Sequence, residues 1–167
     1  MVRPDRAMPG TGPKTGPKAD PTCPGPGGGP GDGPGGGAAA RPDASVLIEM
    51  IFPEQTNHYG TLFGGNGLAL MAKAGFVTAS RFARRNVVLA ASRDVGFVSP
   101  VRLGEVLELT GRITRTGRSS MTVHVEGVAE ALTSGARRPA MRALFEMVAV
   151  DDRGRPVPIK ENQNVSA

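Results

Sequence analysis

The stretch NHYGTLFGGNGLALMAKAGFVTAS, residues 57–80, decides the fold of this chain. It opens with a glycine-rich turn and continues as a run in which only Lys73, Thr78 and Ser80 are polar. A helix on the surface of a domain has one apolar stripe, whereas this run is apolar nearly all the way round. It therefore predicts a helix that ends near Ala83 and is covered on most sides.

The start of this helix leaves two interpretations open. Gly64 and Gly65 expose backbone N–H groups that can donate to a developing oxyanion, and the helix dipole favours negative charge there. The same glycines suit a tight turn that lets helix and sheet approach closely. Asn57, seven residues upstream of Gly64, has a side chain able to orient a water molecule, but asparagine is equally common in turns.

Composition limits the class of protein. The 167 residues allow one ordinary domain plus a tail, and no run approaches the roughly 18 apolar residues of a membrane span. The net charge of +5 comes mostly from scattered arginines with few aromatic residues between them, so nucleic-acid binding is not indicated. A single cysteine, Cys23, excludes an intramolecular disulfide and favours a cytoplasmic setting.

Changes in amino-acid composition along the chain predict the domain boundaries. Residues 1–43 hold 12 Gly and 10 Pro without apolar periodicity, which predicts a disordered tail. Residues 44–160 are expected to form the folded domain, and residues 161–167 a frayed C-terminus.

Apolar alternation predicts the remaining elements as strands, with a bulge at Gly96, a turn at Thr116 and Gly117, and a loop over 133–139. The expected strands cover residues 46–52, 87–98, 107–113, 121–126 and 141–149. One helix among about five strands is an α+β fold, in which an antiparallel sheet has one polar face and one covered by the helix. Exposed sheet edges favour a dimer.

Few other residues indicate a catalytic, metal-binding or ligand-binding role. There is no histidine pair at metal-binding spacing, so no metal site is expected. His124 is interpreted as a solvated strand residue, and His58 as turn packing or a functional residue. Arg118, Ser119 and Ser120 follow a turn glycine and are either phosphate ligands or an ordinary hairpin end.

Together these pieces resemble the acyl-CoA thioesterases of the hotdog fold. The resemblance covers about residues 48–159 and is carried by four motifs in order: Asn57-x-x-Gly60-x-x-Phe63-Gly64-Gly65, Phe97-x-x-Pro100-Val101-x-x-Gly104-Glu105, Gly117-Arg118-Ser119-Ser120-Met121 and Val148-Ala149-Val150-Asp151-x-x-Gly154-Arg155-Pro156. It implies a sheet wrapped around one long central helix and a homodimer or higher homo-oligomer, with acyl-CoA at the dimer interface.

The resemblance also implies site residues. The thioester carbonyl would be polarised at the helix N-terminus, at Gly65 with Gly64 beside it, and Asn57 would belong to the active site. Residues 117–120, namely Gly117, Arg118, Ser119 and Ser120, would hold the coenzyme A portion. No cofactor is expected, since coenzyme A is part of the substrate, and no membrane partner.

The chain departs from the family pattern at the residue after Met71, where a catalytic carboxylate is expected and Ala72 stands. Lys73 cannot substitute, because one residue along a helix turns the side chain by about 100°. A second departure is Leu89-Ala90-Ala91 with Arg93 and Gly96, where the family has Thr-Ala-Ser, an acid, and Asp or Asn.

Three hypotheses therefore remain. The first is an acyl-CoA thioesterase that is weakened or uses Glu54 or His58 as its base. The second is a non-catalytic acyl-CoA-binding protein, a sensor or a partner subunit. In the third, Ala72 is a deliberate substitution that traps substrate.

Overall fold

A computed structural model describes residues 41–159 of the chain. Of the predicted disordered tail, residues 1–40 lie outside the described part, and so does Cys23. The predicted frayed terminus, residues 161–167, also lies outside it.

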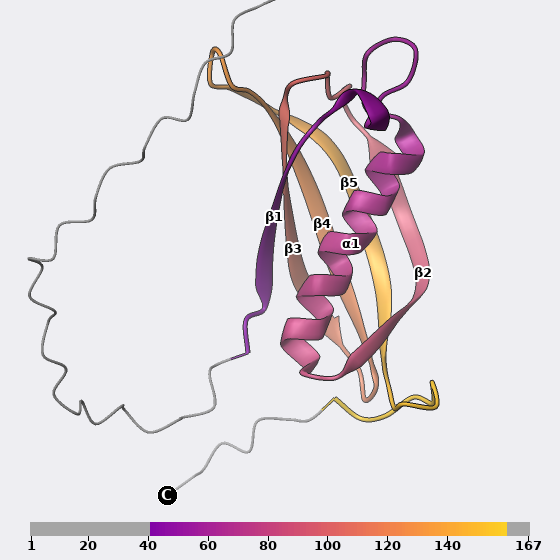
Figure 1. Cartoon of the computed structure of the whole chain (residues 1–167). Helices are drawn as coiled ribbons and strands as arrows, with labels where there is room; N and C mark the ends of the chain where they lie inside the picture. The colour runs from indigo at the N-terminus through magenta and orange to yellow at the C-terminus, as the bar shows by residue number, and fades with distance from the viewer. Residues whose placement is uncertain (1–40, 160–167) are drawn as a thin grey trace, which may run out of the picture. The chain divides into compact units, whose positions relative to one another are not determined.

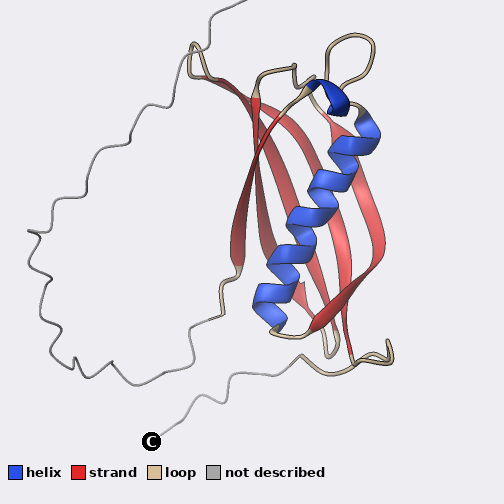
Figure 2. Cartoon of the chain, in the orientation of Figure 1, coloured by secondary structure: helices blue, strands red, loops and turns tan. Residues whose placement is uncertain are grey.

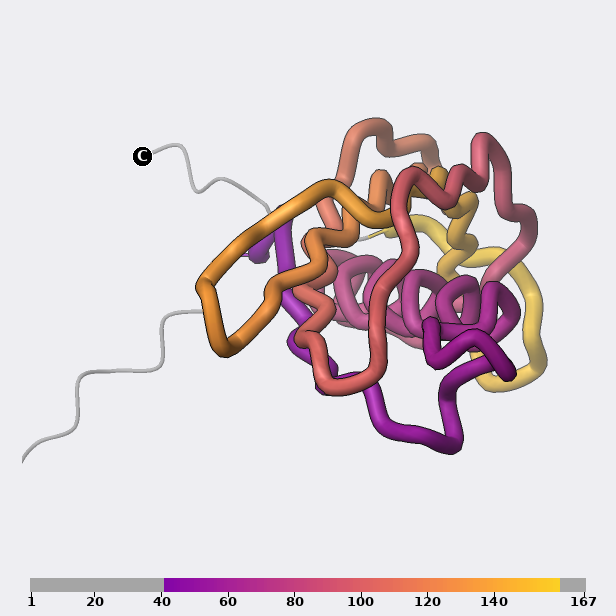
Figure 3. Tube along the Cα trace, turned by 90° about the horizontal axis from the view of Figure 1, so that it is seen from above, coloured from indigo at the N-terminus to yellow at the C-terminus, as the bar shows by residue number. Residues whose placement is uncertain are grey.

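Within residues 41–159 the chain forms one α-helix against a five-stranded antiparallel sheet of order β1-β3-β4-β5-β2 (Figure 1). Figure 2 shows the helix lying along the sheet, and Figure 3, turned by 90°, shows the strands curving past it. The elements are β1 (Ala44–Met50), the short 3-10 helix η1 (Pro53–Gln55), α1 (Gly64–Ala83), β2 (Asn86–Phe97), β3 (Val106–Thr116), β4 (Ser120–Ala131) and β5 (Ala136–Val150).

The predicted alternation along the strands is confirmed. Leu107 and Leu109 of β3 are fully buried against α1, as are Val123 of β4 and Phe145 of β5. Side chains of a strand alternate between the two faces, so one face of the sheet supplies the core under the helix.

Gly111 of β3 marks the closest approach of helix and sheet. A Cβ at this position would collide with Oγ1 of Thr78, which is fully buried on α1 and donates a hydrogen bond to the carbonyl of Ala74 at 2.8 Å. Only glycine leaves room for this buried hydroxyl, so the polar residue within the apolar helix has a structural explanation.

Strand β2 runs along β5 with two irregularities. One lies between Arg93 and Gly96, as predicted, and the other between Leu89 and Ala91. Asp94 in the first has φ of 51°, a left-handed conformation that Asp tolerates better than most residues.

Two predicted boundaries were wrong. β1 ends at Met50 rather than at residue 52, because the chain turns there into η1 with Phe52 as its N-cap residue. Most of the predicted loop at 133–139 is strand, since β5 begins at Ala136 and pairs with β4. Pro139, which has no N–H to donate, lies where the register shifts between Gly127 and Val128.

The prediction that α1 is covered on most sides was also wrong for a single chain. One side packs on the sheet, but Phe76 and Val77 on the other remain 46% and 36% exposed. β2 forms the neighbouring edge of the sheet, with Val88 and Leu89 exposed to a similar extent. The sequence is as apolar as a covered helix, but one protomer supplies only one layer of cover.

The outer face of the sheet carries ion pairs, as expected for a polar face, including Arg137 with Glu108 and Glu130. It is not uniformly polar, however, because Val46 and Ile48 of β1 are 58% and 63% exposed. No helix within residues 41–159 is long and apolar enough to span a membrane.

Candidate active site

The N-terminus of α1 is held by the segment that precedes it. The carbonyl of Gln55 in η1 accepts hydrogen bonds from the backbone N–H of Phe63 at 2.9 Å and from Nδ2 of Asn66 at 3.0 Å. The side chain of Gln55 in turn accepts from the N–H of Phe52 at 2.9 Å. The loop and the first turn of the helix are therefore one connected unit.

Asn57 lies in the loop of this unit, and its amide oxygen is fully engaged. Oδ1 accepts from the N–H of Tyr59 at 3.0 Å and from the N–H and hydroxyl of Thr61, each at 3.2 Å. Two backbone N–H donors on one side-chain atom identify that atom as the oxygen. Only the NH₂ group remains for a ligand, so Asn57 can act on a substrate or a water molecule as a donor.

Gly64 and Gly65 begin α1 without a side-chain cap. The first backbone hydrogen bond of the helix is donated by the N–H of Gly67 to the carbonyl of Phe63, at 3.0 Å. The N–H groups of Gly64 and Gly65 therefore have no hydrogen-bond acceptor among the described residues. These N–H groups can therefore bind an oxygen that carries negative charge.

An apolar cleft of about 330 Å³ adjoins this helix terminus. Phe97 at the end of β2 forms part of its wall, since its ring is the nearest group to a Cβ built on Gly64, at 3.8 Å, or on Gly67, at 3.2 Å. The cleft is lined by Thr61, Leu62, Gly64, Phe97, Val98, Ser99, Pro100, Val101 and Met141. Neither Phe97 nor Met141 was predicted to belong to the site, although Phe97 stands in the motif Phe97-x-x-Pro100.

An ion pair between the buried Glu105 and the half-buried Arg138 supports the rim of this cleft. Arg138 donates two hydrogen bonds to the carboxylate of Glu105, at 2.9 and 2.6 Å, and one to the carbonyl of Pro100 at 2.6 Å. Glu105 also accepts from the N–H of Arg102 at 2.8 Å. The hydrogen bonds from Arg138 lower the pKa of the Glu105 carboxyl and raise the pKa of the guanidinium. A motif residue without an assigned role, Glu105, thus fixes the chain around Pro100.

Ala72 lies two turns into α1, half-buried against the core. Lys73 is exposed beside it, on a different face of the helix. The position at which the family resemblance implies a catalytic carboxylate therefore carries only a methyl group.

Neither local candidate for a base is held in place. Glu54 and His58 are exposed, and neither side chain hydrogen-bonds to another residue within 41–159. The ring of His58 contacts that of Tyr59 at a tilt of 40°, with centroids 3.9 Å apart.

The segment proposed to hold coenzyme A, residues 117–120, lies at the far end of the same protomer. Ser120 pairs with Val148, next to the point where Asn86, just after the helix, pairs with Val150. A 20-residue helix is about 30 Å long. Gly117, Arg118, Ser119 and Ser120 are thus a helix length away from Gly65 of their own chain.

Comparison with known proteins places these features in a family. A model of the thioesterase superfamily matches residues 59–136. The acyl-CoA thioester hydrolase YciA of Salmonella typhimurium is 32% identical over 68% of this chain and 88% of its own length. The chain belongs to the acyl-CoA thioester hydrolases of the thioesterase superfamily.

Further similarities agree with this family. The uncharacterized acyl-CoA thioester hydrolase YkhA of Bacillus subtilis is 35% identical over 65% of this chain, which spans 63% of that relative. The crystal structure of an apo-hexameric acyl-CoA thioesterase superposes with a TM-score of 0.68 and 38% identity, covering 70% of this chain and 75% of that one. The predicted family and hotdog fold of this chain are confirmed.

Proposed function

We propose that this chain hydrolyses the thioester of acyl-CoA, releasing the free acid and coenzyme A, at a site completed by a second protomer. The observation that carries the proposal is the uncapped start of α1. The N–H groups of Gly64 and Gly65 are open there, and Gly64 lines an apolar cleft. Asn57 lies in the loop that leads to this helix start, and its NH₂ group makes no hydrogen bond to another residue of 41–159.

The geometry suits stabilisation of a tetrahedral intermediate. The thioester oxygen accepts hydrogen bonds at Gly65 while the acyl chain enters the apolar cleft. Water adds to the carbonyl carbon, the C–S bond breaks, and the sulfur takes up the proton that the water released. One well-placed oxyanion donor contributes about 10²–10³-fold to the rate.

Ala72 limits this reaction because no carboxylate takes the proton from the attacking water. A positioned general base contributes about 10²–10⁴-fold, so the chain is expected to be a slow thioesterase. Asn57 orients the water or the oxyanion as a donor. Glu54 in η1 and His58 in the loop after it, both exposed, remain candidates for a substitute base.

A second copy is needed because residues 117–120 lie about 30 Å from Gly65 in one chain. Two copies related by a two-fold axis, with their helices antiparallel, bring each coenzyme A segment toward the other copy's helix N-terminus. The exposed residues Phe76 and Val77 of α1 and the open edge of β2 offer the surface for this contact. The hexameric assembly of a related thioesterase supports a dimer or higher homo-oligomer.

The proposed reaction needs no cofactor, because coenzyme A is part of the substrate. We propose a cytoplasmic location, which is supported by the single cysteine of the chain.

Ala72 itself favours a second candidate function. The groups that would bind acyl-CoA are present while the carboxylate is not, as expected of a non-catalytic acyl-CoA-binding subunit or sensor.

Thiol release from a panel of acyl-CoAs separates the two functions, with Ala72→Asp as the test variant and Ala72→Asn as its neutral control. The thioesterase function is supported if the unmodified chain turns over slowly and only Ala72→Asp raises the rate of thiol release, by about 10²–10⁴-fold. Binding without any turnover until Ala72→Asp supports the non-catalytic role. Acyl-CoA binding by none of the three proteins would refute both.

A further inference from the structure

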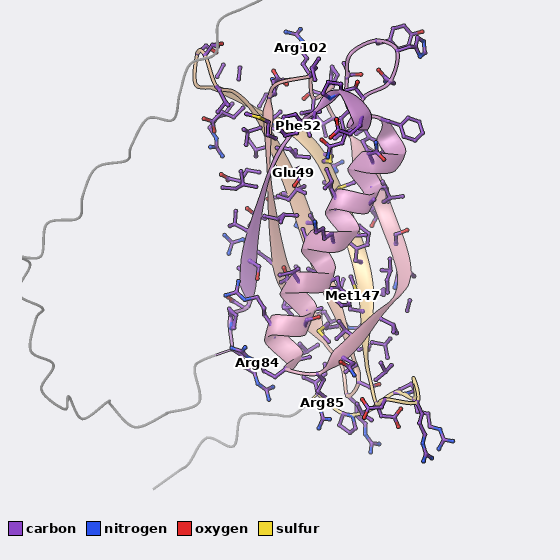
Figure 4. The ribbon with its side chains drawn as sticks, in the orientation of Figure 1. Glu49, Phe52, Arg84, Arg85, Arg102 and Met147 are labelled. Atoms are coloured by element: carbon purple, nitrogen blue, oxygen red, sulfur yellow. The ribbon has the colours of Figure 1, made fainter. Side chains whose placement is uncertain are left out.

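A second cleft, of about 580 Å³, lies at the C-terminal end of α1, away from the helix N-terminus. Figure 4 shows Arg84 and Arg85 there, at the end of the helix opposite Phe52 and Arg102. The residues lining the cleft are Ser80, Arg84, Arg85, Asn86, Val150, Asp151 and Asp152.

The two arginines are fixed by the end of the helix. Arg84 adopts a left-handed conformation, with φ of 53°, and its N–H donates to the carbonyl of Ser80 at 2.9 Å. Asn86 then begins β2 by pairing with Val150. Arg85 is therefore held between a helix cap and the first pair of a sheet.

Neither guanidinium has an anionic partner within the described residues. Arg93, Arg137 and Arg138 each form an ion pair with a glutamate, whereas Arg84 and Arg85 form none in residues 41–159. Nε of Arg85 is buried without any acceptor among these residues. A buried donor without a partner is costly, so a ligand oxygen at this point would be stabilising.

The two acids of the cleft each have one oxygen engaged by neighbouring residues. Oδ1 of Asp151 accepts from the N–H groups of Arg153 and Arg155, at 2.9 and 2.8 Å. Oδ1 of Asp152 accepts from Nδ2 of Asn86 at 3.3 Å. Both carboxylates thus already accept hydrogen bonds, while the guanidinium groups are left for a ligand.

We propose that the Arg84–Arg85 cleft binds a phosphate group. Guanidinium groups donate paired hydrogen bonds to phosphate oxygens, and the hydroxyl of Ser80 adds a further donor at the wall. The phosphate has two possible sources: the nucleotide end of coenzyme A, or a separate phosphate or nucleotide.

The first source rests on the proposed function. Ser120 and Asn86 flank β5 on its two sides, paired with Val148 and Val150. Two strand spacings amount to about 10 Å, so the cleft and the coenzyme A segment lie at the same end of the sheet. A coenzyme A held at residues 117–120 has its phosphates within reach of the cleft.

The test measures the Kd of coenzyme A, 3′-dephospho-coenzyme A, ADP and inorganic phosphate by calorimetry. The variants are Arg84→Asn, which suits the left-handed backbone, Arg85→Gln, and the two combined. Arg153→Gln, an exposed arginine of the adjacent turn, is the matched control. Circular dichroism verifies folding, and Arg84→Asn alone serves if the double variant does not fold.

We expect the double variant to weaken coenzyme A binding about tenfold or more, which corresponds to the loss of about 1.4 kcal/mol, while Arg153→Gln stays within about twofold. An unchanged Kd for 3′-dephospho-coenzyme A then assigns the cleft to the 3′-phosphate. Loss of ADP or phosphate binding with coenzyme A unaffected assigns it to a separate ligand. That result supports the cleft even if the chain hydrolyses no acyl-CoA. Unchanged binding of all four ligands in the variants overturns the proposal, whatever the thioesterase activity.

Discussion

The ring of Phe63 lies over the α-carbon of Gly65, so that a Cβ built there would approach Cε1 of the ring to 2.6 Å and Cδ1 to 3.1 Å. Phe63 is 55% exposed, and its ring can therefore turn away into solvent. The contact makes Gly65 a position where a methyl group disturbs the proposed carbonyl site more than the fold.

Gly65→Ala is expected to lower kcat/KM by about 10²–10³-fold, because the methyl group hinders approach to the oxyanion donor. The Tm should stay within a few degrees, since alanine gains about 1 kcal/mol of helix propensity against the displaced ring. Steady-state thiol release and thermal unfolding measure the two effects. The double variant Phe63→Ala/Gly65→Ala removes the ring but keeps the methyl group at position 65. Recovered activity in this variant would show that the displaced ring of Phe63, and not the methyl group, lowers kcat/KM.

Asn57→Asp separates the structural role of this side chain from its proposed chemical role. The remaining oxygen still accepts the N–H groups of Tyr59 and Thr61, so the loop and the Tm should be nearly unchanged. The NH₂ donor is lost, and kcat should fall about 10²-fold. Asn57→Ala should lose stability as well as activity. Full activity in Asn57→Asp would exclude the amide from the site.

Phe97→Ala should change which acyl chains are accepted, because the ring forms part of the wall of the apolar cleft beside Gly64. Longer or branched acyl-CoAs should gain relative kcat/KM over short ones. Leu132→Ala removes a similarly exposed apolar side chain outside the cleft and should leave the ratio unchanged. An unchanged chain-length profile in Phe97→Ala would place the acyl chain elsewhere.

Glu105→Gln should make stability less dependent on pH. Arg138 lowers the pKa of this carboxyl, so the unfolded chain binds the proton more readily than the folded one. The stabilisation is present above the ordinary pKa of glutamate and is lost as pH falls through the lower, folded pKa. Urea unfolding should show about 1–3 kcal/mol less stability than the unmodified chain at pH 7, and a smaller difference in acid. Glu54→Gln, at an exposed position, should change neither the stability at pH 7 nor its dependence on pH. If the loss of stability in Glu105→Gln were the same at every pH, the ionic role of Glu105 would be contradicted.

Local periodicity was enough to predict α1 and the buried faces of the strands. Leu107 and Leu109 alternate with polar residues, and this alternation requires no knowledge of distant neighbours. The glycine-rich start of the helix could also be predicted, because the residues that form it are adjacent in the chain.

The candidate site was only partly predictable. Asn57 and Gly65 lie near each other in sequence, and the structure joins their segments through the carbonyl of Gln55. Phe97 and Met141 are 44 residues apart in the sequence and reach the same cleft from two different strands. No local pattern indicates that their side chains would line it.

By itself, the sequence determined the order of the elements, the resemblance to a thioesterase and the absence of an acid at Ala72, because each depends on residue identity and local spacing. Only the tertiary structure decided that Arg118 and Gly65 occupy opposite ends of one protomer and that α1 is covered on one side. Both facts depend on pairing between strands distant in the chain, where burial of the common core selects a single register.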